Sequence, residues 1–202
     1  MEECGASLGR VATNGVTVMP QAACFGQLDV VRLKVSAVQG HATSRVSTRD
    51  SPTGCAAHTN PQPTMVRAVI IPGNGGASYP AQLSGNFYDH LAKHLVASNL
   101  FSEVVATCMP DPGPARRNIW LPHLTNTVGI DEETIVIGHS SGAEAALRLA
   151  ETHKMYGVVL VSACHTDLGD AGERQAGWYP PSGGAWQWDA MKQNAGFIAQ
   201  YV

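Results

Sequence analysis

Short apolar runs that do not alternate with polar residues constrain the fold of this 202-residue chain more than any other feature. They are rich in Val and Ile and cover residues 68–71, 104–108, 134–137, 157–162 and 197–202. A strand that is buried on both faces has this pattern, and such strands belong to parallel sheets.

Stretches typical of helices separate these runs, at residues 86–97, 114–124, 140–152 and 186–194. An alternation of strand and helix predicts a three-layer α/β fold, with a mainly parallel sheet of about five strands. In sheets of this kind ligands bind at the carboxyl ends of the strands.

Residues 1–64 differ from the rest of the chain. They hold one aromatic residue, Phe25, and end in a run rich in turn-forming residues at 51–63. Apart from two candidate short strands, at 15–19 and 28–35, they bury too little apolar surface to offset the entropy lost on ordering. We therefore expect a poorly ordered N-terminal extension, 1–64, and a folded domain over 65–202.

Composition excludes several classes of function. The net charge is -3 and only 14% of residues are charged, which argues against binding to nucleic acid or to an anionic membrane. Five cysteines with no C-x-x-C pair suggest free thiols rather than a metal site, and we expect no cofactor. No apolar run approaches the roughly 18–20 residues of a membrane helix, and Met1-Glu2-Glu3 is acidic, so we expect a cytoplasmic protein.

Gly138-His139-Ser140-Ser141-Gly142 fits the G-x-S-x-G pattern of a nucleophile elbow. A predicted buried strand precedes it and a strong helix-forming stretch, 143–150, follows it. A second match centred on Ser7 has neither flank. The context therefore predicts Ser140 as a catalytic nucleophile, and the alternative is a structural serine that caps a helix.

A glycine-rich turn at residues 72–76 follows the first predicted strand. Acyl transfer needs two backbone N–H donors for the developing oxyanion. We expect one donor to be the amide of Ser141 and the other to come from the turn, at Asn74 or Gly75. The alternatives are a plain turn or a phosphate cradle, although neither a P-loop nor a complete G-x-G-x-x-G motif is present.

A serine nucleophile also needs a histidine base and an acid that orients it. After Ser140 the only histidines are His153 and His165, and both precede every later aspartate, so the order serine–aspartate–histidine cannot be written. His139 is expected to be packed. His165 follows the fourth predicted strand and could line the pocket or act as a substitute base.

Several longer tracts then point to one family, at residues 68–76, 109–112, 119–122, 138–143, 150–153, 159–163, 167–170 and 186–188. Through them residues 67–202 resemble the retinoblastoma-binding protein 9 family of small serine hydrolases. The resemblance implies an α/β-hydrolase fold without a cap domain and a Ser-His-Asp mechanism with Ser140 as nucleophile. The family's aspartate and histidine would follow Val202, which implies a C-terminally truncated domain with impaired catalysis.

Three functions follow from these features. The first is hydrolysis of a small-molecule ester, thioester or amide, with Trp178, Trp186 and Trp188 either walling the acyl pocket or packing as ordinary core residues. The second is a catalytically impaired form that acts as a binding protein. The third is a flavodoxin-like phosphate binder that uses the glycine-rich turn.

The resemblance also implies a macromolecular partner. The family's namesake binds a retinoblastoma-type pocket protein through Leu-x-Cys-x-Glu, and the matching stretch here is Val128-Gly129-Ile130-Asp131-Glu132. Because the Leu and Cys are replaced, the motif is degenerate, and we expect a solvated loop at this place.

Overall fold

The computed structural model describes residues 66–75, 81–84 and 86–201. The predicted N-terminal extension, including its two candidate strands and Ser7, lies outside these residues.

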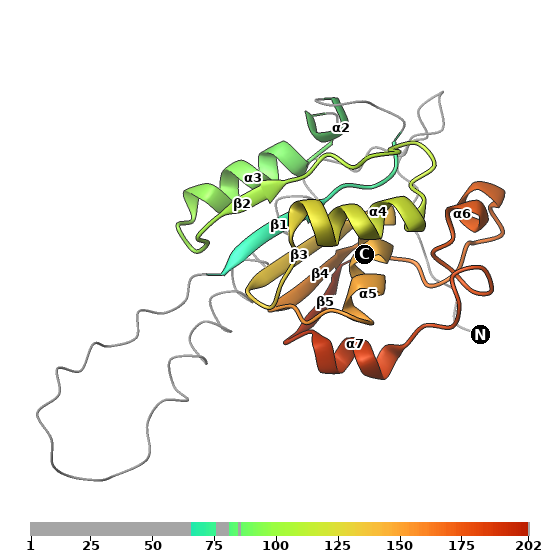
Figure 1. Ribbon diagram of the computed structural model, residues 1–202. Helices are drawn as coiled ribbons and strands as arrows, with labels where there is room; N and C mark the ends of the chain where they lie inside the picture. The colour runs from blue at the N-terminus through green and yellow to red at the C-terminus, as the bar shows by residue number, and fades with distance from the viewer. Residues whose placement is uncertain (1–65, 76–80, 85, 202) are drawn as a thin grey trace, which may run out of the picture.

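Five strands form one sheet in the order β2-β1-β3-β4-β5, and every neighbouring pair is parallel (Figure 1). The strands are β1 (Arg67–Ile71), β2 (Val104–Ala106), β3 (Thr134–His139), β4 (Gly157–Val161) and β5 (Ile198–Tyr201). Ile71 at the end of β1 pairs with Gly138 near the end of β3. The strand that enters the G-x-S-x-G motif therefore lies beside the strand that enters the glycine-rich turn.

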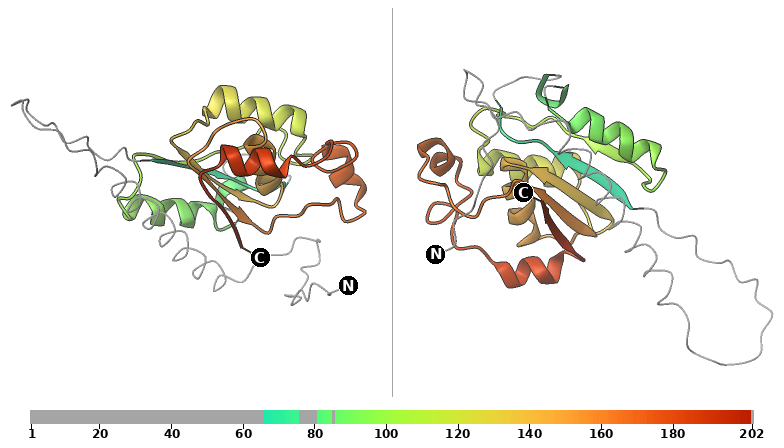
Figure 2. Two further views of the ribbon diagram at one scale, coloured as in Figure 1. Left: turned by 90° about the horizontal axis from the view of Figure 1, so that it is seen from below. Right: turned by 180° about the vertical axis from the view of Figure 1, so that it is seen from behind.

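Helices cover both faces of the sheet, which confirms the predicted three-layer α/β fold (Figure 2). They are α2 (Ala81–Ser84), α3 (Tyr88–Ala97), α4 (Arg117–His123) continued by the π-helix η1 (Leu124–Val128), α5 (Ser141–Ala150), α6 (Ala171–Ala176) and α7 (Trp188–Asn194). α3 lies on one face, and α4, α5 and α7 lie on the other. The sequence did not predict α6, because its residues are mostly exposed and have no apolar period.

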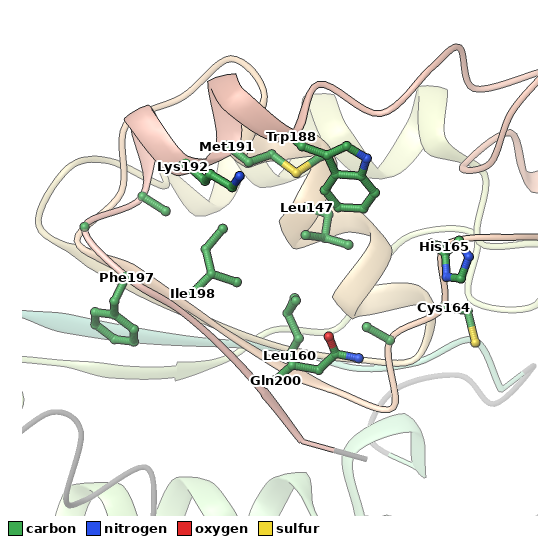
Figure 3. A pocket seen from close by; sticks show the side chains of 13 residues that line it. Leu147, Leu160, Cys164, His165, Trp188, Met191, Lys192, Phe197, Ile198 and Gln200 are labelled. Carbon is green, nitrogen blue, oxygen red and sulfur yellow. The ribbon is translucent and has the colours of Figure 1, made fainter. Parts of the chain in front are cut away.

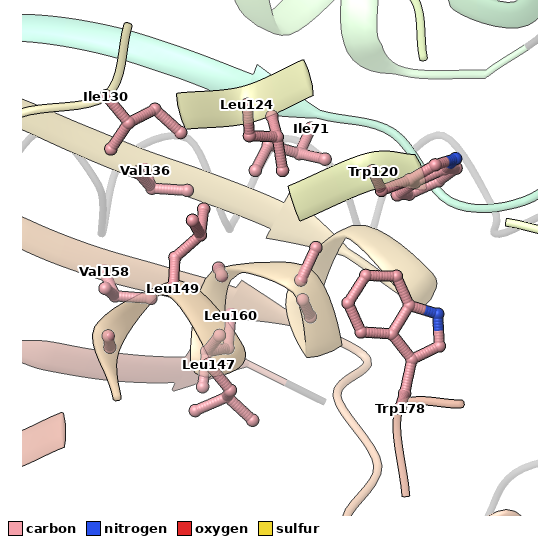
Figure 4. Packing of buried hydrophobic residues seen from close by; sticks show 14 of the residues in the cluster. Ile71, Trp120, Leu124, Ile130, Val136, Leu147, Leu149, Val158, Leu160 and Trp178 are labelled. Carbon is pink, nitrogen blue, oxygen red and sulfur yellow. The ribbon is translucent and has the colours of Figure 1, made fainter. Parts of the chain in front are cut away.

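Alternate residues of β1, β3 and β4 enter two separate cores. Val69 and Ile71 of β1 belong to the cluster beneath α4 and α5, whereas Ala68 and Ile70 belong to the cluster beneath α3. Figure 4 shows Ile71 in the first cluster, which it shares with Leu149 of α5. Burial on both faces explains why the strand sequences are apolar without alternation.

Arg148 of α5 anchors the long segment that precedes α7. Its side chain is 1% exposed, and its Nε and Nη2 atoms donate to the Trp178 carbonyl at 2.9 and 2.6 Å. Nη2 also reaches the Gly184 carbonyl at 2.9 Å, and Nη1 forms an ion pair with Glu151 at 2.7 Å. The Trp186 ring lies 3.8 Å from the guanidinium carbon. One buried cation therefore holds residues 178–186 against the helix that follows Ser140.

Replacing Arg148 with Met should lower the free energy of unfolding by about 3–5 kcal/mol, because it leaves Glu151 without its ion-pair partner and the Trp178 and Gly184 carbonyls without their donor. Urea unfolding of the full chain measures the loss. Arg174→Met is the matched control, since Arg174 pairs with Asp167 at 2.8 Å but is 54% exposed. Equal losses in both variants would contradict the anchoring role of Arg148.

Candidate active site

Ser140 lies between β3 and α5 with φ 52° and ψ -126°, a backbone conformation that side chains rarely adopt. Its N–H donates to the Val161 carbonyl at 3.0 Å, which ties the turn to the end of β4. The Ser140 side chain forms no cap hydrogen bond with α5. A serine that merely capped this helix would have an extended backbone and would accept a bond from the first turn. The geometry is instead that of a strand-to-helix elbow.

Gly138 and Gly142 flank the elbow where the backbones are closest. A Cβ atom on Gly138 would overlap the backbone of Gly142, and a Cβ atom on Gly142 would overlap the Ile71 carbonyl. Only glycine lets β1, β3 and the start of α5 approach this closely. The two glycines of the motif are thus required by packing between segments that are distant in sequence.

The glycine-rich turn packs directly on the elbow. A Cβ atom on Gly73 would lie 3.0 Å from the Cβ atom of Ser140. The Gly75 amide donates to the Pro112 carbonyl at 3.1 Å, so this predicted oxyanion donor is already engaged. Among the described residues the Asn74 amide has no acceptor, and the Ser141 amide stands in the first turn of α5, where backbone donors are unpaired.

His139 is packed, as the sequence predicted, and faces α3 rather than Ser140. Its Nδ1 atom lies 2.7 Å from the hydroxyl of Tyr88. Burial lowers the pKa of His139 to about 4, so the imidazole is neutral at pH 7. His165 is exposed, and its carbonyl accepts a hydrogen bond from Trp186 Nε1 at 2.9 Å. Within residues 66–75, 81–84 and 86–201, no imidazole is hydrogen-bonded to the Ser140 hydroxyl.

Glu144 is a site residue that sequence reasoning missed. It lies one turn after Ser140 and is 1% exposed. Its Oε1 atom accepts from the Cys164 amide at 2.7 Å, and it is also hydrogen-bonded to the Tyr179 hydroxyl. Burial raises the pKa of Glu144 to about 8. A carboxyl group among the apolar positions of the 143–150 helix was the sequence signal for this buried contact.

The comparisons with known proteins agree with this geometry. The profile of a family described as alpha/beta hydrolase of unknown function, DUF1057, matches residues 99–167. Serine hydrolase RBBP9 from Rattus norvegicus is 44% identical over 135 residues, which are 67% of this chain and 69% of the relative. The chain belongs to the RBBP9 family of serine hydrolases.

A solved structure supports the same fold for this RBBP9-family chain. The crystal structure of the ydeN gene product from B. subtilis matches with a TM-score of 0.51 and 25% identity. The match covers 67% of this chain and 69% of that chain. Within the described part of the chain, no helix is long and apolar enough to cross a membrane.

A groove of about 670 Å³ lies beside the elbow helix of this RBBP9-family chain, between α5, α7, β4 and β5 (Figure 3). His165 and Trp188 line it, together with Leu147, Leu160, Met191 and Ile198, whereas Trp186 does not. Ser140 does not line it, so the groove and the elbow are adjacent features rather than one cavity.

The three tryptophans considered for the acyl pocket have different positions. Trp178 is 0% exposed and its Nε1 atom donates to the Ala115 carbonyl at 2.9 Å, so of the two alternatives it adopts core packing. Burying the indole in the core satisfies both its apolar surface and its N–H donor. Trp186 and Trp188 stack with ring centroids 5.5 Å apart, and Trp188 is 46% exposed.

The stretch from Val128 to Glu132 is more packed than the solvated loop that we expected. Arg67 donates to the carbonyls of Val128 and Gly129 at 2.7 and 2.9 Å, and Ile130 is 6% exposed. These contacts attach the turn between η1 and β3 to the side chain of Arg67, at the start of β1. Binding of a retinoblastoma-type pocket protein stays a prediction.

Gly142→Ala should destabilise the protein by about 1–3 kcal/mol, because the new methyl group meets the Ile71 carbonyl. Thermal and urea unfolding measure the change. Gly75→Ala is the control, since a Cβ atom there meets nothing within 4 Å. If the two variants were equally stable, the close approach of α5 to β1 would not constrain the fold.

Glu144→Gln should change how stability depends on pH. In the folded protein the pKa of Glu144 is about 8, against 4.5 ordinarily, so unfolding releases a proton between these values. Stability then falls as pH rises through this window, by up to about 1.4 kcal/mol per pH unit. Gln stays neutral, so the variant should gain stability relative to wild type between pH 5 and 8. Parallel stability curves would contradict a neutral Glu144.

Proposed function

We propose that Ser140 is the nucleophile of a serine hydrolase that acts on a small ester, thioester or amide. The observation that carries the proposal is the strained backbone of Ser140 at the end of β3, with the glycine-rich turn packed against it. Strain of this kind persists where the surrounding structure enforces it, and it is concentrated at functional sites. Membership of the RBBP9 family supports the same reaction class.

In the proposed reaction the Ser140 hydroxyl attacks the substrate carbonyl and the carbonyl oxygen becomes an oxyanion. The amides of Ser141 and Asn74 stabilise that charge. We choose Asn74 over Gly75, because the Gly75 amide is already bonded to Pro112. Collapse of the intermediate expels the alcohol, thiol or amine, and water then releases the acid from Ser140.

The proton of the Ser140 hydroxyl needs a base. His139 is bonded to Tyr88 and has a lowered pKa, and Glu144 is buried with a raised pKa. In the described part of the chain neither side chain is hydrogen-bonded to the Ser140 hydroxyl. This observation favours a second candidate function, in which the chain binds acyl compounds and turns them over slowly or not at all.

Labelling of the full chain with a fluorophosphonate probe tests the proposal. The wild type should form a covalent adduct, whereas Ser140→Ala should form none, because it lacks the attacking oxygen. Ser7→Ala is the matched control, since Ser7 stands in the other G-x-S-x-G match, and it should label as the wild type does.

Two results would contradict the proposal. Equal labelling of Ser140→Ala and wild type would place the reactive group elsewhere. A folded wild-type chain that does not react would favour the binding function.

A further inference from the structure

One buried hydroxyl joins the two halves of the candidate active site. Tyr88, the first residue of α3, is 3% exposed. Its oxygen accepts from the Gly73 amide at 2.9 Å and lies 2.7 Å from Nδ1 of His139. Gly73 immediately precedes Asn74 in the glycine-rich turn, and His139 immediately precedes Ser140. The Tyr88 phenol thus bridges the glycine-rich turn and the elbow, although Tyr88 takes no part in the proposed reaction.

The direction of this hydrogen-bond chain depends on which atom receives the Tyr88 proton. The Tyr88 oxygen accepts from Gly73, and among the described residues Nδ1 of His139 is the acceptor that lies within reach of its single proton. An accepting Nδ1 requires that His139 carries its ring proton on Nε2. Both groups are neutral at pH 7, because burial raises the pKa of Tyr88 to about 12 and lowers that of His139 to about 4.

The glycine-rich turn is held on both sides of Asn74. Tyr88 fixes the amide of Gly73, and the Pro112 carbonyl fixes the amide of Gly75. Between these two bonds the Asn74 amide has no acceptor among the described residues, so it is available to a ligand. The ideal Cβ position of Gly73 is only 3.0 Å from Ser140 Cβ, so small displacements of the turn alter the distance between Asn74 and the nucleophile.

The imidazole of His139, at the other end of this series of hydrogen bonds, is also held in place. The ring of Phe87 meets that of His139 edge-on, with centroids 5.2 Å apart and an interplanar angle of 77°. Phe87 and Tyr88 are consecutive, so the start of α3 sets both the plane of the imidazole and the position of its hydrogen-bond partner. A phenylalanine at position 88 would pack equally well beside Leu91, and only the hydroxyl distinguishes the native residue.

We propose that Tyr88 is a positioning residue, whose hydroxyl holds the Asn74 amide at the distance from Ser140 that an oxyanion site requires. The inference rests on the proposed function, since it gives Asn74 and Ser140 their roles. It adds a residue of α3 to the candidate active site, and it assigns His139 to the Nε2–H tautomer.

Tyr88→Phe removes the hydroxyl and keeps the ring. We expect the maximal rate of fluorophosphonate labelling to fall at least about tenfold, since loss of a whole oxyanion donor costs about 10²–10³. The probe concentration at half-maximal rate should change little, because the variant alters the transition state more than binding. Tyr156→Phe, which removes a hydroxyl from a tyrosine packed against the same core cluster, should label at the wild-type rate.

A second readout does not depend on activity. ¹⁵N NMR at pH 7 should show His139 of the wild type as the Nε2–H tautomer and show a mixture of tautomers in Tyr88→Phe. Hydrogen exchange of the Gly73 amide should accelerate in the same variant, because the amide loses its acceptor. Tyr156→Phe should leave both signals unchanged.

A pair of His139 variants tests the other end of the bridge. His139→Asn places an acceptor near the position of Nδ1, whereas His139→Leu does not, and the first should label faster. Equal rates in this pair, or an unchanged labelling rate in a folded Tyr88→Phe, would overturn the inference. If Ser140→Ala labels like wild type, or if wild type does not react, the proposed function fails instead. An unchanged tautomer and unchanged Gly73 exchange in Tyr88→Phe would then overturn the bridge as well.

Discussion

The close approach of α5 to the end of β1 is the constraint on which the rest of this structure depends. Gly142, in the first turn of α5, lies against the Ile71 carbonyl, and Gly138 lies against the backbone of Gly142. A chain that turns so sharply from β3 into α5 brings Ser140 to a positive φ. The strain at Ser140 is therefore the local consequence of packing a helix tightly against a parallel sheet.

Two buried polar residues of α5 extend this constraint to segments far along the chain. Glu144 holds the loop after β4 through the Cys164 amide, and Arg148 holds Trp178 and Gly184 through their carbonyls. They stand four residues apart and so lie on one face of the helix. The helix that follows the nucleophile thus organises the whole stretch from β4 to α7, and buried hydrogen bonds offset the cost of placing polar groups in the core.

The pKa values of Glu144 and His139, on either side of Ser140 in the sequence, are shifted in opposite directions. Burial keeps Glu144 protonated and His139 unprotonated near neutral pH, so both groups next to the elbow are uncharged. An oxyanion that forms at Ser140 would therefore meet backbone amides without competition from a fixed carboxylate charge on Glu144. A neutral surrounding of low polarity strengthens hydrogen bonds to a developing charge.

The sequence by itself determined the architecture and the place of the elbow. Apolar runs without alternation indicate strands that are buried on both faces. The glycines, the strand and the helix around Ser140 indicate a sharp turn from strand to helix. Both features could therefore be predicted from residues that are neighbours in the sequence. Only the tertiary structure decided which amides of the glycine-rich turn have acceptors, because Pro112 and Tyr88 approach the turn from other parts of the chain. The same holds for the burial of Trp178. A hydrogen-bond partner depends on which segments meet in space, and no local pattern encodes that meeting.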